Sequence, residues 1–347
     1  MNTRLAARLL MLAALSAIAA CGPQGPSNLP RTAGGTSAVA HTSRKAYATP
    51  PGRRTPAIAQ DEANRLLLMY GGASEQASLS DLWGWDGRGW QALQAPAGPM
   101  LAYPFAAYDP GSHHLLVIGS STSDQSRHEI WSWSGKIWRQ ESSWLSPQCG
   151  KACTGSGSQP AYAGPTAADA SLSSVVMLSG SNTAPGMDTW IWDGSQWKPM
   201  VTAHRPLAIG SPVYDSANGR LMVLGYTGQN WGGINVTWLF DGHDWTVSSA
   251  FTPDGNSVMV DDPALGGVVL IAQPLDPAQT PPTTWLWNGA AWRNLNLVQT
   301  PSPVGASLGY YAPSKQVLLF GGNTPGGQSA AQTWLFDGRS WQPAPAP

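Results

Sequence analysis

The sequence predicts an all-β protein, a six-bladed β-propeller whose blades are four-stranded antiparallel sheets. Three observations lead to this fold class. A tryptophan-rich motif recurs six times, an apolar run precedes each copy, and the 347-residue chain has 39 glycines and 30 prolines but only 11% charged residues. Glycine and proline at this density interrupt helices, and repeats of this length are typical of propellers and solenoids. We therefore expect short strands joined by many turns.

The recurring motif has the form Trp-x-Trp/Phe, then Asp, Ser or Asn, then Gly-x-x-Trp, and each copy predicts a β-hairpin. Residues two apart on a strand share a face, so the first two aromatic rings pack together against a neighbouring sheet. The Asp-Gly type pair suits a tight turn because glycine tolerates positive φ. Successive copies begin 48, 59, 48, 47 and 49 residues apart, so the second interval carries an insertion. The copies are residues 83–90, 131–138, 190–197, 238–245, 285–292 and 334–341.

Each unit also has two strands upstream of its hairpin. One is a continuous apolar run, which suits a strand covered on both faces. The other is a strand of small residues that closes in a turn, as in Phe105–Pro110. Four strands per unit, repeated at this spacing, predict propeller blades. The apolar runs are 66–70, 115–118, 175–178, 221–224, 268–271 and 317–320. The predicted blades are 55–97, 98–146, 161–203, 204–250, 251–299 and 300–347.

Residues 1–20 have the features of a bacterial lipoprotein signal peptide. Arg4 and Arg8 precede a twelve-residue apolar run that is too short to span a bilayer as a helix. The segment Ile18–Cys21 resembles the lipobox, which implies that Cys21 is acylated and becomes the new N-terminus. We therefore expect a lipid-anchored protein of the bacterial cell envelope, on the extracytoplasmic side, with no membrane-spanning helix.

The rest of the chain divides into a tether and the propeller. Residues 21–54 are rich in Pro, Gly, Ser and Thr and lack apolar periodicity, which predicts a flexible tether. Residues 55–347 hold all six units. The first unit begins with its innermost strand and the last ends with its outermost strand, so the ring requires no strand exchange. Residues 44–49 could still add one strand to it.

Two glycine pairs carry a family resemblance. Gly71-Gly72 and Gly321-Gly322 end the apolar strands of the first and last units, and Ser80–Trp83 opens a third strand. These segments resemble the repeats of Kelch-type propellers, the group that includes the central domain of galactose oxidase, over residues 55–347. The middle units lack the glycine pair, so the resemblance implies the fold and not an inherited function. The hairpin turn is also similar to the Asp box of sialidase-type propellers, but it is one residue shorter.

Strand order sorts the connections onto two faces. The first-to-second and third-to-fourth turns lie on one face, and they are short and uniform. The remaining connections, which are longer and more variable, lie on the opposite face, called here the connection face, where function is expected. The insertion, residues 142–162, belongs to this face. Its Cys149 and Cys153 predict a disulfide in an exported protein, and no metal site is predicted because further ligands at metal-motif spacing are missing.

Candidate ligand-binding residues lie on the connection face. Trp144 and Trp231 are the two tryptophans that the repeat does not explain, and their rings could stack on a sugar or on a partner. The alternative is that each ring folds over a neighbouring blade. Four polar residues could contribute to binding or be ordinary solvated surface: Asn230, Arg127, His128 and Arg205.

Three acidic residues occupy one position of the repeat. Asp81, Glu129 and Asp188 each lie two residues before the first Trp of a copy, in three consecutive units. Together they could form an acidic arc on the connection face. The alternative is that each accepts a hydrogen bond at the start of its strand.

The expected function is non-enzymatic: a membrane-anchored module that binds or scaffolds a protein or polysaccharide of the cell envelope. The alternative is a carbohydrate-active hydrolase, lyase or oxidase at the mouth of the propeller channel, and hydrolysis would need two converging carboxylates. A net charge of −1 without a Lys/Arg block excludes nucleic acid as a partner. The cysteine and histidine pattern does not suit the copper-radical chemistry of galactose oxidase. We expect no cofactor and a monomeric chain.

Overall fold

The computed structural model describes residues 46–146, 159–180, 185–208, 210–227, 234–274 and 280–346. The chain divides into two units, Met1–Arg44 and Lys45–Pro347, and all the described residues belong to the second. Several sequence predictions therefore lie outside the described residues: the signal peptide, most of the tether, and Cys21, Cys149, Cys153, Asn230 and Trp231.

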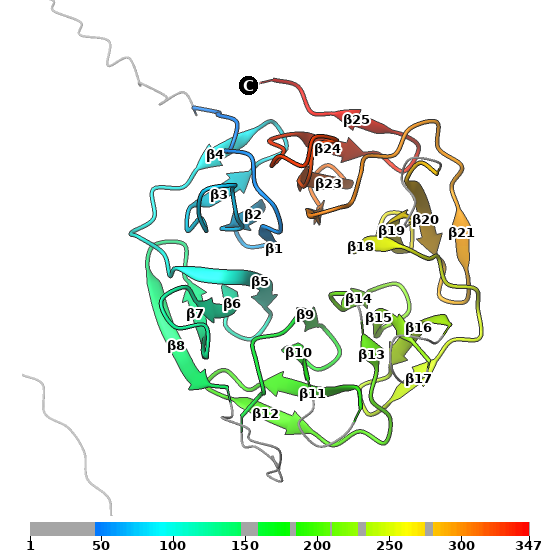
Figure 1. The fold of residues 1–347 in the computed structure, drawn as a ribbon, viewed down its shortest axis with the longest axis horizontal. Helices are drawn as coiled ribbons and strands as arrows, with labels where there is room; N and C mark the ends of the chain where they lie inside the picture. The colour runs from blue at the N-terminus through cyan, green and yellow to red at the C-terminus, as the bar shows by residue number, and fades with distance from the viewer. Residues whose placement is uncertain are drawn as a thin grey trace, which may run out of the picture. The chain divides into compact units, whose positions relative to one another are not determined.

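Six antiparallel sheets form the blades of a propeller, which confirms the predicted fold class (Figure 1). Blade 1 contains β1 (Ala57–Asp61), β2 (Leu66–Tyr70), β3 (Leu82–Trp85) and β4 (Trp90–Ala92). Blade 2 contains β5 (Leu101–Asp109), β6 (His114–Ser121), β7 (Arg127–Trp133) and β8 (Trp138–Leu145). Blade 3 contains β9 (Thr166–Asp169), β10 (Ser174–Gly180), β11 (Met187–Trp192) and β12 (Trp197–Met200).

The second half of the ring repeats this plan. Blade 4 contains β13 (Leu207–Ala208), β14 (Val213–Asp215), β15 (Arg220–Tyr226), β16 (Asn235–Phe240) and β17 (Trp245–Val247). Blade 5 contains β18 (Asn256–Asp262), β19 (Gly267–Gln273), β20 (Thr283–Trp287) and β21 (Trp292–Asn294). Blade 6 contains β22 (Ala306–Tyr311), β23 (Gln316–Gly321), β24 (Thr333–Phe336) and β25 (Trp341–Pro343).

The ring is ordered as the chain is. In every blade the strands pair in sequence order from the centre outward, and the innermost strands of neighbouring blades contact each other, including β1 with β22. In blade 4 the innermost strand consists of two pieces, β13 and β14, which both pair with β15. Pro212, which cannot donate a backbone hydrogen bond, lies just before the second piece. The described residues contain no helix, and hence none that could cross a membrane.

The hydrophobic core lies between the blades. The second strand of each blade is almost fully buried because it is covered on both faces, as its uninterrupted apolar run predicts. Six clusters of buried residues occupy the six interfaces between neighbouring blades, which we call seams and number by the blades that they join. Each hairpin therefore packs its tryptophans against the preceding blade, and stability rests on contacts between neighbours.

The hairpin turns behave as the motif predicts. The glycines of the six turns have φ between 87° and 94°, where a side chain would be strained: Gly87, Gly135, Gly194, Gly242, Gly289 and Gly338. In most copies the residue before this glycine accepts a hydrogen bond from the backbone N–H two residues ahead, as Asp193 does from Ser195 at 2.9 Å. The turns on this face are thus held by the chain itself.

The segment before β1 closes the ring without adding a strand. Arg53 N–H donates to Ala330 O of blade 6 at 3.1 Å, and Arg54 pairs through its backbone with Ala73 of blade 1 at 2.8 and 2.9 Å. We call residues 53–54 the latch. Residues 46–49 form no strand, although Ala48 N–H donates to Trp90 O.

Candidate functional site

A hydrogen bond between side chains locks four of the six seams. The last tryptophan of each hairpin, at the start of the outermost strand, points its indole N–H into the preceding blade. There it meets the hydroxyl of a threonine that directly precedes the first tryptophan of that blade's hairpin. The four pairs are Trp245 with Thr189 at 2.8 Å, Trp292 with Thr237 at 2.9 Å, Trp341 with Thr284 at 3.0 Å and Trp90 with Thr333 at 3.0 Å.

Two seams lack this lock. At the threonine position, blade 1 has Leu82 and blade 2 has Ile130, both buried. The corresponding indole N–H groups, of Trp138 and Trp197, are buried and have no acceptor in the part of the chain that the structure describes. These two seams therefore depart from the hydrogen-bonding pattern of the other four.

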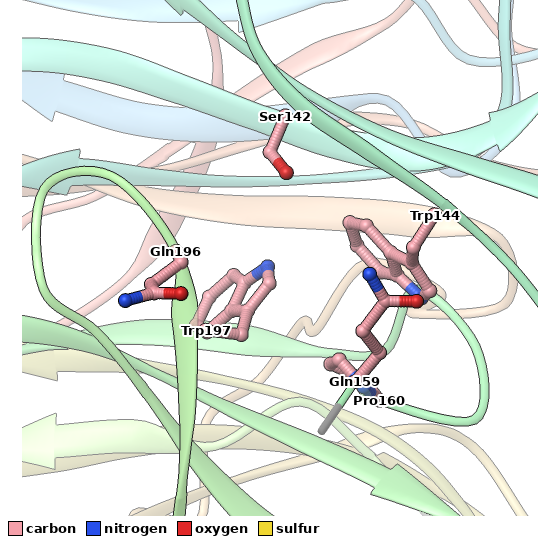
Figure 2. A pocket seen from close by; sticks show the side chains of 6 residues that line it. All are labelled: Ser142, Trp144, Gln159, Pro160, Gln196 and Trp197. Carbon is pink, nitrogen blue, oxygen red and sulfur yellow. The ribbon is translucent and has the colours of Figure 1, made fainter. Parts of the chain in front are cut away.

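The 2–3 seam contains a cavity (Figure 2). It has a volume of about 60 Å³ and lies between the outermost strand of blade 2, the segment at residues 159–160 and the turn before β12. Figure 2 shows Trp197 with its indole nitrogen turned toward Ser142 across the cavity. The lining residues are Ser142, Trp144, Gln159, Pro160, Gln196 and Trp197.

Trp144 occupies the 2–3 seam. β8 continues to Leu145, so residues 142–145, which the sequence prediction placed in both blade 2 and the insertion, belong to the blade. Trp144 is 4% exposed and packs in the cluster between blades 2 and 3. Its indole N–H, like that of Trp197, has no acceptor among the described residues. The ring is therefore folded into the seam, with one side against the cavity.

His128 lies behind Trp144 in blade 2. The His128 side chain is only 3% exposed, and the centroids of its ring and of the Trp144 ring are 5.5 Å apart. Burial lowers the pKa of His128. Its Nδ1 lies 3.1 Å from Ser120 Oγ and its Nε2 lies 2.6 Å from Ser146 Oγ. Two hydroxyl partners and a lowered pKa indicate a neutral ring that supports the Trp144 side chain.

The three acidic residues differ from one another. Asp81 and Glu129 each accept the indole N–H of the tryptophan two residues ahead, at 2.6 and 2.7 Å, whereas Asp188 pairs with Arg205 Nε at 3.1 Å. Asp81 also accepts hydrogen bonds from both terminal nitrogens of the buried Arg53 guanidinium, at 2.6 and 2.8 Å. Burial alone would raise the pKa of Asp81, but the hydrogen bonds from Arg53 and Trp83 bring it below its usual value. These geometries link strand starts to neighbouring side chains and do not gather the three residues into one site.

The remaining candidate cations are engaged locally. Arg127 begins β7, and its Nε lies 3.9 Å from Asp124 Oδ2 within the same loop. Arg205 crosses from the blade 3 to blade 4 connection to reach Asp188, as above. The structure brings His128 close to Trp144 but brings neither arginine to the cavity.

Carboxylates on the innermost strands hold turns. Five blades end their innermost strand in a buried aspartate that accepts backbone N–H groups of the following turn: Asp61, Asp109, Asp169, Asp215 and Asp262. Asp261 accepts Ser216 N–H of the preceding blade at 3.1 Å, and burial raises its pKa to about 6. Within the described ranges no group of three His, Cys, Asp or Glu residues could hold a metal ion.

Exposed apolar side chains gather on the connection face. Of the ten most exposed large hydrophobic residues among those described, nine lie in or next to blade connections or second-to-third loops. They include Tyr103, Ile234 and Phe251, exposed by 75%, 77% and 67%. The tenth, Ile137, lies in a hairpin turn on the opposite face. These nine are Met100, Tyr103, Leu145, Tyr162, Val201, Ile234, Val247, Phe251 and Val298.

The seam locks are the feature that sequence reasoning missed. The signal was present, because a threonine precedes the first tryptophan in four copies of the motif, and leucine or isoleucine replaces it in the other two. Its meaning depended on knowing that the last tryptophan of the next copy reaches that position.

No protein-family model and no curated protein matches the chain. Solved structures do match. The structure of YjhT has a TM-score of 0.52 at 12% identity over 85% of this chain and 98% of its own. TolB from Acinetobacter baumannii has a TM-score of 0.45 at 13% identity, over 83% and 61%. The propeller domain of the Trilobed protease from Pyrococcus furiosus, described as having an open velcro topology, has a TM-score of 0.45 at 12% identity, over 84% and 81%. At these identities the likeness to YjhT shows that the chain is a six-bladed β-propeller.

Proposed function

We propose that this chain is a binding module that engages a partner protein through its connection face. The observation that carries the proposal is the concentration of exposed apolar side chains there. Exposed apolar residues that share one face can supply the apolar part of a protein interaction surface, whereas isolated ones need no explanation. The chain is also poor in charge, at 11%, so the partner surface that suits this face is apolar and weakly charged.

The opposite face offers a contrast within the same molecule. Its turns are short and are closed by their own aspartate and asparagine side chains, as at Asp193 and Asn288. Its one strongly exposed large hydrophobic residue among those described is Ile137. A rigid scaffold that presents variable loops on one face is the usual arrangement for recognition.

Site-specific photocrosslinking tests this assignment. A photoreactive phenylalanine analogue replaces Tyr103 or Phe251 on the connection face, or Ile137 on the turn face as the matched control, in the full-length chain in its native host. We expect one discrete crosslinked protein from the first two positions and none from the third. Substitution of Ile234 by serine should reduce its yield. Equal crosslinking from Ile137, or none from Tyr103 and Phe251, would overturn the proposal.

We also propose that Cys21 carries lipid and holds the propeller at the cell envelope through the tether. The support is the sequence of residues 1–20 and the lipobox-like segment Ile18–Cys21. Metabolic labelling with a radioactive fatty acid should mark the wild-type chain and not Cys21→Ser, which should be released from membranes. Equal labelling of both chains would contradict the anchor without affecting the binding assignment.

A further inference from the structure

We propose that Asn288 is a site of spontaneous deamidation, at which the folded hairpin turn of blade 5 promotes conversion of the side-chain amide to a carboxylate. The chain has two Asn-Gly sequences, Asn288-Gly289 and Asn218-Gly219, and their hydrogen bonds differ. Asn288 lies in a turn on the face opposite to the connection face, so this inference depends on neither assignment proposed above.

The reaction needs only the chain and water. The backbone nitrogen of the glycine loses its proton and attacks Cγ of the asparagine, which forms an N–C bond and places negative charge on Oδ1. The bond from Cγ to Nδ2 then breaks, the leaving nitrogen takes up a proton, and ammonia and a five-membered imide remain. Water opens the imide at either carbonyl to give aspartate or isoaspartate, with no change of oxidation state. Glycine favours the attack because no side chain shields its nitrogen.

The hydrogen bonds at Asn288 favour this attack. Its Oδ1 accepts the backbone N–H groups of Ala290 and Ala291, at 3.1 and 2.9 Å. Both donors point at the atom on which negative charge develops, as in an oxyanion hole, and they draw electron density away from Cγ. Among the described residues, Asn288 Nδ2 and the Gly289 N–H have no hydrogen-bond partner. The leaving group and the nucleophile are therefore not held.

The hydrogen bonds at Asn218 oppose the same reaction. Its Nδ2 donates to both carboxylate oxygens of the buried Asp215, at 3.0 and 2.8 Å, which holds the leaving nitrogen and adds electron density to the amide. The Gly219 N–H donates to Asp215 O at 2.8 Å, so the nucleophile is held as well. Both asparagines are exposed, so access to water does not separate them. The hydrogen bonds therefore predict that Asn288 reacts first.

The fold requires the glycine that makes Asn288 reactive. Gly289 has a φ of 92°, where a side chain would be strained. A Cβ at this position would also collide with Oδ1 of Asn218, which lies across the 4–5 seam. The turn therefore cannot accept a bulkier residue that would slow the attack.

The two products differ in their effect on the hairpin. Four other turns have aspartate at this position, and Asp193 accepts the equivalent two N–H groups, both at 2.9 Å. Conversion of Asn288 to aspartate therefore keeps the turn and adds one negative charge. Isoaspartate adds one atom to the main chain and displaces the carboxylate from these donors. We expect isoaspartate to weaken the lock between Trp292, which follows this turn, and Thr237.

Peptide mapping by mass spectrometry tests the proposal. The folded full-length chain is incubated in mildly alkaline buffer made with H₂¹⁸O, so that each new carboxylate carries ¹⁸O and differs from one formed during sample handling. We expect Asn288 to convert at least tenfold faster than Asn218. This ratio corresponds to about 1.4 kcal/mol of activation free energy, the scale of one hydrogen bond. Equal rates, faster conversion of Asn218 or no conversion of Asn288 would overturn the proposal.

The same chain unfolded in urea is the matched control. Both Asn-Gly sequences then lose their hydrogen bonds, so their rates should become similar. A tenfold difference that persists in urea would assign the effect to the flanking residues and would also overturn the proposal. In the folded chain, Asn288→Ser, which introduces the residue of the blade 2 turn, should remove most of the ¹⁸O uptake at asparagine, and Asn218→Ser should not. The reverse result would contradict the assignment.

Discussion

The 6–1 and 2–3 seams solve the same packing problem in different ways. The 6–1 seam, where the two ends of the ring meet, has the Trp90–Thr333 lock and the latch, whose backbone bonds reach both blades. The 2–3 seam has Ile130 in place of threonine, a cavity, and three indole donors (Trp144, Trp190 and Trp197) without an acceptor among the described residues. The ring therefore has a lock and the latch at the 6–1 seam, where no chain connection joins the two blades, and has neither at the 2–3 seam, where the chain runs on from one blade to the next.

The comparison also explains the two glycine pairs. A Cβ on Gly72 would lie 2.7 Å from Arg54 O, and one on Gly321 would lie 2.4 Å from Arg53 O. Both glycines have positive φ, at 92° and 79°. One glycine of each pair thus lies where the latch runs against the backbone, in the first and last blades.

Removal of the Arg53 side chain from the 6–1 seam should have the largest effect on stability. Its guanidinium is fully buried and donates to Asp81 and to Gly71 O. We expect Arg53→Ala to lower the free energy of unfolding by about 3 kcal/mol, the lower end for a broken buried ion pair because Asp81 is partly exposed. Urea unfolding measures this loss. Arg339→Ala, in an exposed turn, is the control, and equal losses in the two variants would contradict the latch.

The 4–5 seam should be pH-sensitive in a way that the 6–1 seam is not. Asp261 accepts Ser216 N–H there, whereas Gln60 accepts Ala312 N–H at the equivalent place in the 6–1 seam. Burial raises the pKa of Asp261 to about 6 from 3.8, so the folded state binds more protons between these values. The ionised Asp261 carboxylate therefore lowers the free energy of unfolding at pH 7, and this destabilisation disappears as the pH falls through 6 toward 4.

We expect Asp261→Asn to raise the free energy of unfolding at pH 7 by at most about 3 kcal/mol, and to match the wild type near pH 4. The difference between the two chains in urea unfolding, measured from pH 4 to pH 8, isolates this group from the other carboxylates. A difference that is constant over this range would show that Asp261 titrates normally.

Removal of one seam lock should have a moderate effect. Thr189→Val keeps the shape of the side chain but deprives the buried Trp245 N–H of its acceptor, which is now 2.8 Å away. We expect a loss of about 2 kcal/mol in thermal or urea unfolding. Thr189→Ser, which keeps the hydroxyl, is the control and should lose less. If valine were tolerated as well as serine, the lock would contribute nothing to stability.

The reverse change should have the smallest effect. Ile130→Thr removes buried apolar surface but gives Trp197 an acceptor, and the two terms nearly cancel. We expect a change within about 1 kcal/mol in urea unfolding, although an apolar residue is lost from the core. A loss as large as that of Thr189→Val would mean that Trp197 already has a partner.

The sequence predicts the fold well because its signals are local and repeated. Alternation, turn glycines and apolar runs assign strands within each unit, and six copies average out the exceptions. The sequence does not predict the side-chain contacts between neighbouring blades. That Trp197 meets Ile130 and Trp245 meets Thr189 follows only when the blades stand side by side, since 67 and 56 residues separate the partners in the chain.

The candidate site shows the same limit. Trp144 stands out in the sequence because it lies outside the repeat, but the sequence does not show that it is buried beside His128. Its indole N–H has no acceptor among the described residues, and the cavity beside it is lined in part by Gln196 and Trp197 of the next blade. No pattern within the insertion carries that information.

Hydrogen exchange of the indole N–H groups tests the central claim most directly. With signals assigned by single Trp→Phe variants, the rates in D₂O compare the locked tryptophans with Trp197 in one sample. We predict that Trp90, Trp245, Trp292 and Trp341 exchange slowest and that Trp197 exchanges at least tenfold faster, falling to their rate in Ile130→Thr. Equal rates for Trp197 and the four locked tryptophans in the wild-type chain would contradict the account.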